Sequence, residues 1–223
     1  MWYRLFKYVL LGPLLRLLGR PDVKGLDNVP RTGPVIIAAN HLAVIDSLYL
    51  ALVLPRRVTF LAKQEYFTGR GVRGRFNRWF YSVSGQVPVD RTGGSAAADA
   101  LAAATRILEA DGVWAIHPEG TRSPDGRIYR GRTGALRVAM TTGAPVVPAT
   151  LSGTDLVNPR HTRLLRFGKV RIDFGAPRHY PPVAQRDAVR TATDELMREL
   201  ATQSGRCYVD RYAATFARPA IRS

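Results

Sequence analysis

The sequence predicts an α/β fold in which a mixed, largely parallel sheet is flanked by helices. Short runs rich in β-branched residues alternate along the chain with longer stretches of helical periodicity, which is typical of strands joined by crossover helices. The 223 residues are enough for one domain with a sizeable core, and the apolar share of 46% is that of a globular protein. We expect an N-terminal helical segment over 1–20, the main domain over 21–205 and a C-terminal tail over 206–223.

The individual elements follow from hydrophobic periodicity and turn residues. The expected strands are 35–39, 58–62, 87–90, 113–116, 146–151 and 170–174. The expected helices follow a candidate N-cap at Asn40, cover 73–83, follow a second candidate N-cap at Ser95, and cover 132–142 and 185–203. Gly143 and Gly205 are expected to end the last two helices.

Positive charge dominates the composition. The chain has 33 Lys and Arg residues against 17 Asp and Glu, a formal net charge of +16. Such an excess predicts an anionic partner, namely nucleic acid, a membrane surface, a phosphorylated substrate or an acidic carrier protein. A genome-wide bias towards Arg and Ala is an alternative source of part of it. Because the sequence holds no helix-turn-helix, zinc-finger or aromatic RNA-binding motif, nucleic acid is not expected as a partner.

Cysteine and histidine usage limits the chemistry. The single cysteine, Cys207, excludes an internal disulfide and a Cys-rich zinc site. The four histidines lack the spacing of metal ligands, so no metal is expected. A reducing, cytoplasmic environment is the default expectation.

The first twenty residues combine apolar side chains with cations and contain no acid. The cations are Arg4, Lys7, Arg16 and Arg20. The longest uncharged run, 8–15, is far shorter than the roughly 20 apolar residues that span a bilayer, and Gly12-Pro13 should break or kink a helix. Since cations three and four positions apart can share a helical face, we expect an interfacial anchor that lies on a membrane without crossing it. The alternative is a terminal helix that packs on the domain's own core.

A candidate catalytic pair, His41 and Asp46, follows the first predicted strand. The carboxyl ends of parallel strands open onto the ligand crevice of such folds. In a regular helix these side chains would lie about 140° apart, so they meet only if His41 stands on the strand-to-helix turn and Asp46 reaches back from the first helical turn. Asp46 would then accept from one imidazole nitrogen and leave the other free to take a substrate proton. The alternative for His-x4-Asp is a helix cap with a nearby acid.

A second polar cluster, 117–123, follows the predicted strand 113–116. Gly120 lets a ligand approach the backbone, and Arg122 can hold a phosphate through two parallel hydrogen bonds. Glu119 can accept from a ligand hydroxyl or hold an arginine. An ordinary polar turn uses the same residue types and is the alternative.

Four sequence blocks occur in a diagnostic order. They are Asn-His-x4-Asp at 40–46, Gly-Gln-Val-Pro-Val-Asp-Arg at 85–91, Pro-Glu-Gly-Thr-Arg-Ser at 118–123 and Ala-Pro-Val-Val-Pro-Ala at 144–149. Lys63-Gln64-Glu65 adds a basic-x-acidic element between the first two. Together they resemble the glycerophospholipid acyltransferase family over 23–180, so the expected fold is glycerolphosphate acyltransferase-like and 21–205 is the expected acyltransferase domain.

The resemblance implies an acyl-transfer reaction. His41, assisted by Asp46, would deprotonate the free hydroxyl of lysophosphatidic acid, and the alkoxide would attack an acyl thioester to give phosphatidic acid. The residues implied in acceptor binding are Lys63, Arg91, Glu119, Gly120, Thr121 and Arg122. The three cations among them would hold the acceptor phosphate, and the others would position the acceptor.

The resemblance also implies the partners. The donor would be acyl-CoA or acyl-acyl carrier protein, and neither a cofactor nor a metal is implied. The enzyme would work at the cytoplasmic face of the cell membrane as a monotopic or peripheral protein on an anionic surface. One alternative keeps this chemistry and changes the acceptor to another lysophospholipid, a glycolipid or an aminolipid. A non-enzymatic basic module on membranes or nucleic acid is the alternative from another class, which the paired motifs disfavour.

Two positions depart from the family pattern. Pro88 stands where the second block usually carries an aromatic or aliphatic residue, so the wall of the acceptor pocket is expected to differ. His117 stands where an apolar residue, often Phe, usually precedes the third block. It is either a ring that fills the aromatic slot or a second base.

Overall fold

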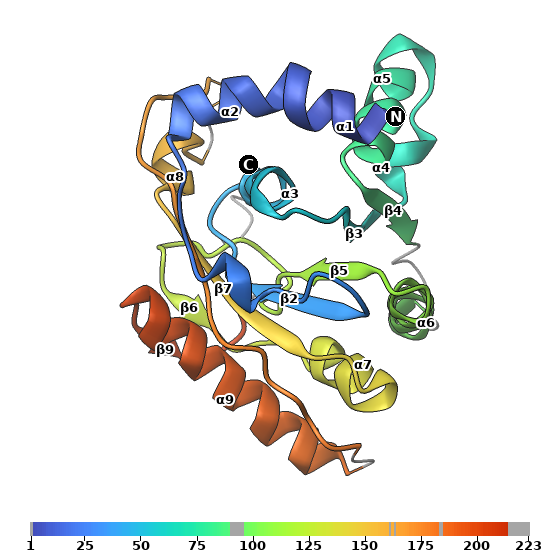
Figure 1. The fold of residues 1–223 in the computed structure, drawn as a ribbon, viewed down its shortest axis with the longest axis vertical. Helices are drawn as coiled ribbons and strands as arrows, with labels where there is room; N and C mark the ends of the chain where they lie inside the picture. The colour runs from blue at the N-terminus through green and yellow to red at the C-terminus, as the bar shows by residue number, and fades with distance from the viewer. Residues whose placement is uncertain (1, 90–95, 161, 163, 183–184, 214–223) are drawn as a thin grey trace, which may run out of the picture.

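The structure, a computed structural model, describes residues 2–89, 96–160, 162, 164–182 and 185–213. Its central sheet lies between two helical layers (Figure 1). The helices are α1 (Trp2–Leu5), the π-helical turn η1 (Phe6–Leu10), α2 (Leu11–Gly19), the 3-10 turn η2 (Leu26–Asn28), α3 (Asp46–Val53), α4 (Glu65–Thr68), α5 (Gly71–Val83), α6 (Ala96–Glu109), α7 (Gly134–Thr142), α8 (Thr154–Val157) and α9 (Arg186–Ser204). The strands are β1 (Asp22–Lys24), β2 (Val35–Ala39), β3 (Val58–Lys63), β4 (Gln86–Val89), β5 (Val113–Ile116), β6 (Ile128–Tyr129), β7 (Val146–Ser152), β8 (Arg171–Phe174) and β9 (Tyr208–Val209).

The predicted fold class, a mixed and largely parallel sheet, is confirmed. The strand order is β1-β8-β7-β2-β5-β3-β4. The strands from β7 to β4 in this order run parallel, β8 is antiparallel to β7, and β1 is parallel to β8. β2 is central, with Ile37 level with Ala115 on β5 and Val147 on β7. The carboxyl ends of β2 and β5 therefore reach the same edge of the sheet.

Both faces of β2 are buried because its side chains alternate between two apolar clusters. Val35, Ile37 and Ala39 pack with residues of α2 and α3. Ile36 and Ala38 pack with residues of α6, α7 and α9 on the other face. This double burial fixes the strand that carries the first motif.

Most expected elements are confirmed to within two residues. β2 and β5 have the expected bounds, and Gly143 and Gly205 end α7 and α9 with φ of 70° and 65°. Asp90 and Ser95, assigned to a strand and a helix cap, lie outside the described residues. The sequence patterns did not anticipate the edge strand β1 or the small sheet of β6 and β9.

The expectation that Asn40 caps the next helix is wrong. α3 begins at Asp46, after Ile45, so a loop separates Asn40 from the helix. The buried Asn40 amide instead donates from Nδ2 to the carbonyl oxygen of Leu151 at 3.0 Å and accepts from the Leu151 N–H at 2.7 Å. Asn40 therefore ties the end of β2 to β7.

The helix is not broken at Gly12-Pro13, where the sequence predicted a break or a kink. α1, η1 and α2 follow one another without interruption, and the wider π-helical turn precedes Pro13, which lacks the N–H of a regular helix. A Cβ on Gly12 would overlap the carbonyl oxygen of Lys7, five residues earlier. Glycine is therefore required at position 12, where the backbone passes close to the Lys7 carbonyl oxygen.

The N-terminal helix packs on α3 through one of its faces (Figure 1). Leu15 and Leu18 are buried there, and the Tyr49 hydroxyl donates to the Leu15 carbonyl oxygen at 3.0 Å. Lys7, expected on the outward basic face, is only 7% exposed and donates to the Leu54 carbonyl oxygen. Burial lowers the pKa of Lys7 to about 8. Among the residues that the structure describes, no helix is both long and apolar enough to cross a bilayer.

The chain after α9 returns to the domain. β9 pairs in parallel with β6, and Nη1 of Arg206 donates to the Gly126 carbonyl oxygen at 2.6 Å. The first part of the expected tail, 206–213, is thus packed on the fold, while 214–223 lie outside the described residues.

Candidate active site

The structure brings His41 and Asp46 together as the spacing required. His41 stands on the loop after β2, and Asp46 is the first residue of α3. Nδ1 of His41 lies 2.8 Å from Oδ2 of Asp46. Because Asp46 accepts here, Nδ1 carries the proton and Nε2 keeps a lone pair for a substrate proton.

Asp46 is held as a carboxylate by the same loop. Its Oδ2 also accepts from the N–H groups of Leu42 at 2.6 Å and Ala43 at 2.9 Å. Complete burial opposes ionisation, but the hydrogen bond and charge of His41 outweigh it and lower the pKa of Asp46. The carboxylate therefore orients the imidazole and stabilises it when it becomes protonated.

His117 fills the ring slot beside the pair. Its ring stacks on that of His41 with 4.0 Å between centroids and 7° between planes. Its Nδ1 donates to the carbonyl oxygens of Asn40 at 2.9 Å and Ala39 at 3.1 Å, and its Nε2 lies 3.4 Å from Oγ of Ser47. Burial, and then the neighbouring His41, lower the pKa of His117 to about 3. This environment favours a neutral positioning ring over a second base.

Glu119 is buried beside the dyad and holds two backbone N–H groups in place. It is 2% exposed, with Oε1 accepting from the His41 N–H and Oε2 from the Tyr129 N–H, both at 3.1 Å. Burial raises the pKa of Glu119 to about 7. Since both oxygens hold backbone groups, the geometry supports a positioning role rather than the direct acceptor contact that the sequence suggested.

The loop after Glu119 carries exposed backbone and cations. Gly120 has φ of 74° and is exposed, and the half-buried Thr121 and Arg122 follow. The Ser123 N–H donates to the His41 carbonyl oxygen at 2.7 Å, which holds this loop against the dyad. Within the described part of the chain, no carboxylate lies within ion-pair distance of the Arg122 guanidinium, so this group is available to an anion.

Two further arginines, which no motif indicated, join this loop. Nη2 of Arg160 donates to the Arg122 carbonyl oxygen at 2.7 Å, and partial burial together with the Arg122 charge lowers the pKa of Arg160. The Arg132 side chain lies against Gly120, 3.0 Å from the position of a Cβ there. Arg160 lies 38 positions from Arg122, and Arg132 lies 12 positions from Gly120. Neither separation matches a helix or strand period, so the sequence pattern did not indicate these contacts.

The other two predicted phosphate ligands, Lys63 and Arg91, remain predictions, because the structure describes neither of their side chains. Lys63 ends β3 and pairs in register with Val89 of β4. β5 separates β3 from β2 in the sheet. The side chain of Lys63 and the whole of Arg91 lie outside the described residues.

Fold and site together define an α/β protein with a histidine–carboxylate pair and a cationic loop at the carboxyl ends of adjacent parallel strands. A family model with the description Acyltransferase matches residues 20–152. The chain belongs to this acyltransferase family. In the matching region lie both the dyad and the cationic loop.

Several curated relatives share one name, 1-acyl-sn-glycerol-3-phosphate acyltransferase. The chloroplastic proteins of Brassica napus and Arabidopsis thaliana are each 32% identical over 160 residues, which cover 71% of this chain and 45% and 43% of theirs. The alpha form of Mus musculus is 28% identical over 197 residues, 82% of this chain and 65% of that protein. The chain thus spans less than half of the two plant relatives.

A solved structure has the same fold. The crystal structure of the 1-acyl-sn-glycerophosphate acyltransferase of Thermotoga maritima superposes with a TM-score of 0.65 over 86% of this chain and 75% of that one. The sequence identity is 24%. The α/β architecture with its N-terminal helix therefore belongs to a known structural class.

Proposed function

We propose that this protein transfers a fatty acyl group from an acyl thioester to the free hydroxyl of lysophosphatidic acid, forming phosphatidic acid. The observation that carries the proposal is the 2.8 Å contact between His41 Nδ1 and Asp46 Oδ2, which leaves Nε2 as the base. The shared name of the curated relatives supports lysophosphatidic acid as acceptor.

The dyad supports direct transfer without an acyl-enzyme. Nε2 of His41 takes the hydroxyl proton while the hydroxyl oxygen forms a bond to the thioester carbonyl carbon. Collapse of the tetrahedral intermediate breaks the carbon–sulfur bond, and the departing thiolate takes the proton back from His41. Asp46 keeps the imidazole in one tautomer throughout both transfers.

The arginines around 120–122 support binding of the acceptor phosphate. Arg122 offers a planar fork that matches phosphate, and Arg132 and Arg160 add positive charge to the same loop. The thioester donor is acyl-CoA or acyl-acyl carrier protein, and both are anions that the +16 chain attracts.

The proposal includes attachment to the cytoplasmic face of a membrane through the N-terminal helix. Opposite its packed face, the helix exposes Leu5, Tyr8, Val9, Leu14 and Leu17. Exposed apolar side chains with Arg16 and Arg20 beside them are typical of a helix that lies in the headgroup region.

Product analysis tests the function. Purified protein in detergent micelles is given palmitoyl-CoA or palmitoyl-acyl carrier protein with a panel of lyso-acceptors, and products are identified by mass spectrometry. We expect phosphatidic acid from lysophosphatidic acid with one or both donors. Preferential acylation of a glycolipid or an aminolipid would show that this lipid is the acceptor. The absence of any acylated product would overturn the proposal.

A further inference from the structure

Large apolar side chains on the outside of the molecule are concentrated in three segments. Among the residues that the structure describes, thirteen are exposed, and ten of these belong to the N-terminal helix, to α5 or to the loop from α8 to β8. The five on the N-terminal helix are named above; the others are Val72 and Trp79 of α5, and Leu156, Leu164 and Phe167 of the loop. Val72, Leu164 and Phe167 are 75%, 79% and 70% exposed, and the grouping of such residues in a few segments is the informative observation.

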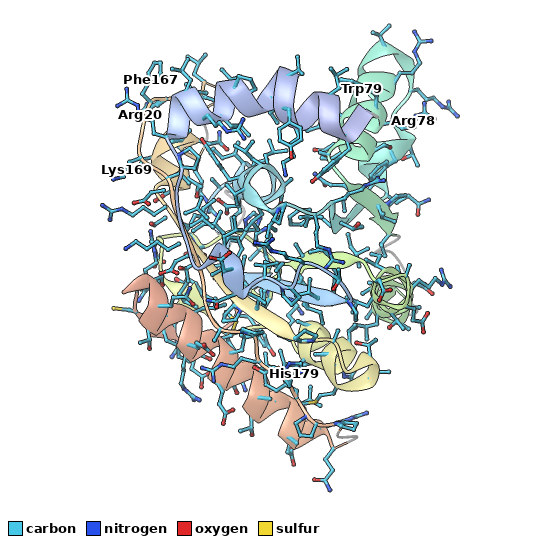
Figure 2. The ribbon with its side chains drawn as sticks, viewed as in Figure 1. Arg20, Arg78, Trp79, Phe167, Lys169 and His179 are labelled. Atoms are coloured by element: carbon cyan, nitrogen blue, oxygen red, sulfur yellow. The ribbon has the colours of Figure 1, made fainter. Side chains whose placement is uncertain are left out.

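The loop segment is fastened to the C-terminal end of α2. The Gly168 N–H donates to the Leu18 carbonyl oxygen at 2.9 Å, and the Val170 N–H donates to that of Gly19 at 2.7 Å. Figure 2 shows Phe167 and Arg20 together at this end of the helix. Leu165, between the two exposed apolar residues, packs towards the core and anchors the loop.

α5 stands at the opposite end of the N-terminal helix (Figure 1). Tyr3, near the start of that helix, and Ser84, which follows α5, line the same small cavity. Arg78 and Trp79 are seen on α5 at this end in Figure 2. The three segments thus follow one edge of the molecule, with the helix in the middle.

Cations accompany the apolar side chains at both ends. Exposed Arg20, Arg160, Arg166 and Lys169 surround the loop, and exposed Arg75 and Arg78 lie on α5. The acids near the loop are Asp22, which pairs with Lys169 at 3.8 Å, and Asp155. The local balance is therefore positive, which complements an anionic surface.

We propose that α5 and the exposed residues Leu156, Leu164 and Phe167 insert, on either side of the N-terminal helix, into a bilayer that contains anionic lipids. The proposal rests on the membrane attachment proposed above and adds two contacts that fix the orientation of the domain. Apolar side chains distributed along an edge with cations between them suit a headgroup layer, whereas a protein partner usually meets one continuous apolar core. The two added contacts lie at the two ends of the N-terminal helix, so they fix the tilt of its long axis relative to the bilayer.

Site-specific labelling tests this orientation, since Cys207 is the only cysteine. In a C207S background, Phe167→Cys, Val72→Cys and Leu17→Cys are each labelled with an environment-sensitive nitrobenzoxadiazole dye. The natural chain labelled at the exposed Cys207, next to β9 on the α9 side of the sheet, is the matched control. Vesicles of phosphatidylcholine with phosphatidylglycerol are added, with nitroxide-bearing lipids as depth quenchers.

The expected result is a blue shift with about a twofold or larger rise in emission, and quenching by the nitroxide lipids, at 17, 72 and 167 but not at 207. A fluorescence response of the dye at position 17, without a response at position 72 or 167, would overturn this inference and leave attachment by the helix intact. No response at any of the three positions would overturn both this inference and the proposed membrane attachment by the helix. A response at 207 equal to that at 167 would contradict an oriented contact. Acyl transfer measured in micelles is independent of these results, so failure of the proposed reaction is seen separately.

A partition measurement checks the apolar contribution of the loop. Replacing Leu164 and Phe167 by Ser is expected to weaken binding to the same vesicles about tenfold, because two apolar side chains no longer leave water. The matched replacement Val87→Ser, at an exposed residue of β4 outside the three segments, should leave binding unchanged. Equal binding by the Leu164 and Phe167 variant and the natural chain would overturn insertion of the loop.

Discussion

Three neighbours hold His41, each through a different part of the residue. Asp46 holds Nδ1, the His117 ring covers one face of the imidazole, and Glu119 accepts from the backbone N–H. None of these contacts uses Nε2. The ring of His41 is therefore held in one orientation, and in the proposed reaction this positioning would spare the entropy of alignment.

The stacking role of His117 leads to a prediction with two substitutions. His117→Phe keeps a ring in the slot and is expected to retain kcat within about threefold, although it loses the bonds to the Ala39 and Asn40 carbonyl oxygens. His117→Ala removes the ring, frees the His41 imidazole and should lower kcat about tenfold or more. Steady-state kinetics of both variants measure this, and loss of activity in His117→Phe would show that the imidazole itself is needed.

Glu119 makes the free energy of unfolding depend on pH. Its pKa in the folded state is about 7 against a usual 4.5, so the folded state binds the proton more tightly than the unfolded state. The stability due to protonated Glu119 is therefore complete below about pH 4.5 and is lost as pH rises to about 7. Glu119→Gln stays neutral, so the stability of the natural chain relative to this variant should fall by up to about 3 kcal/mol across that window.

Urea unfolding of both proteins between these pH values measures the difference. Glu109→Gln, at the exposed end of α6, is the matched control and should show no such change. A difference between Glu119→Gln and the natural chain that stays constant with pH would contradict the raised pKa.

The sequence pattern predicted the pair of His41 and Asp46, but it did not predict the contacts that His117 and Glu119 make with His41. His-x4-Asp and the positions of His41 and Asp46 on a strand-to-helix turn could be predicted because both residues are local in sequence. The stack of His117 on His41 and the contact of Glu119 with the His41 N–H join residues 76 and 78 positions apart, and they depend on the register between β2 and β5. A pattern along the chain does not contain that register.

At the scale of elements, the N-terminal helix presents two faces. Lys7, Leu15 and Leu18 face the domain, while Leu14 and Leu17 face outwards. The inner face confirms the alternative that the helix packs on the domain's own core, and the exposed apolar face is the one that we propose lies on a membrane. The π-helical turn at Phe6–Leu10 lets the helix continue through Pro13.

Gly12 is the critical position of this helix. Gly12→Ala is expected to lower the free energy of unfolding by about 2 kcal/mol or more, because the added Cβ meets the Lys7 carbonyl oxygen rather than a flexible side chain. Gly134→Ala, where the new Cβ makes an ordinary 3.4 Å contact with Leu101, is the control and should be neutral or slightly stabilising. Chemical denaturation compares the two variants, and equal stability of both would contradict the close approach of Gly12 to the Lys7 carbonyl oxygen.

Strands and helices with strong periodicity could be predicted because burial decides them locally. β2 and β5 are continuous apolar runs, and α7 and α9 end at glycines with positive φ. β1, β6 and β9 have only two or three residues, and their pairing depends on partners elsewhere in the chain. Such short strands have no periodicity of their own to reveal them.

At the scale of the whole molecule, the parallel sheet brings the His41–Asp46 pair next to a positively charged loop. Adjacent strands β2 and β5 end at the same edge, so the loop with His41 meets the loop with Arg122 although the two lie far apart in sequence. The net charge of +16 gathers in part at this loop and in part along the edge with the exposed apolar side chains. Both partners that we propose, a phosphorylated acceptor and an anionic membrane, would be attracted by this surplus of arginine.

The most direct test of the central claim is the initial rate of phosphatidic acid formation by His41→Ala, with palmitoyl-CoA and lysophosphatidic acid as substrates. His179→Ala, at an exposed histidine near α7 and α9 and across the sheet from α3 (Figures 1 and 2), is the matched control. We expect His41→Ala to lose about 10⁴-fold or more in kcat with an unchanged unfolding midpoint, and His179→Ala to match the natural chain. A His41→Ala protein that forms phosphatidic acid at the natural rate would contradict the assignment of His41 as the base.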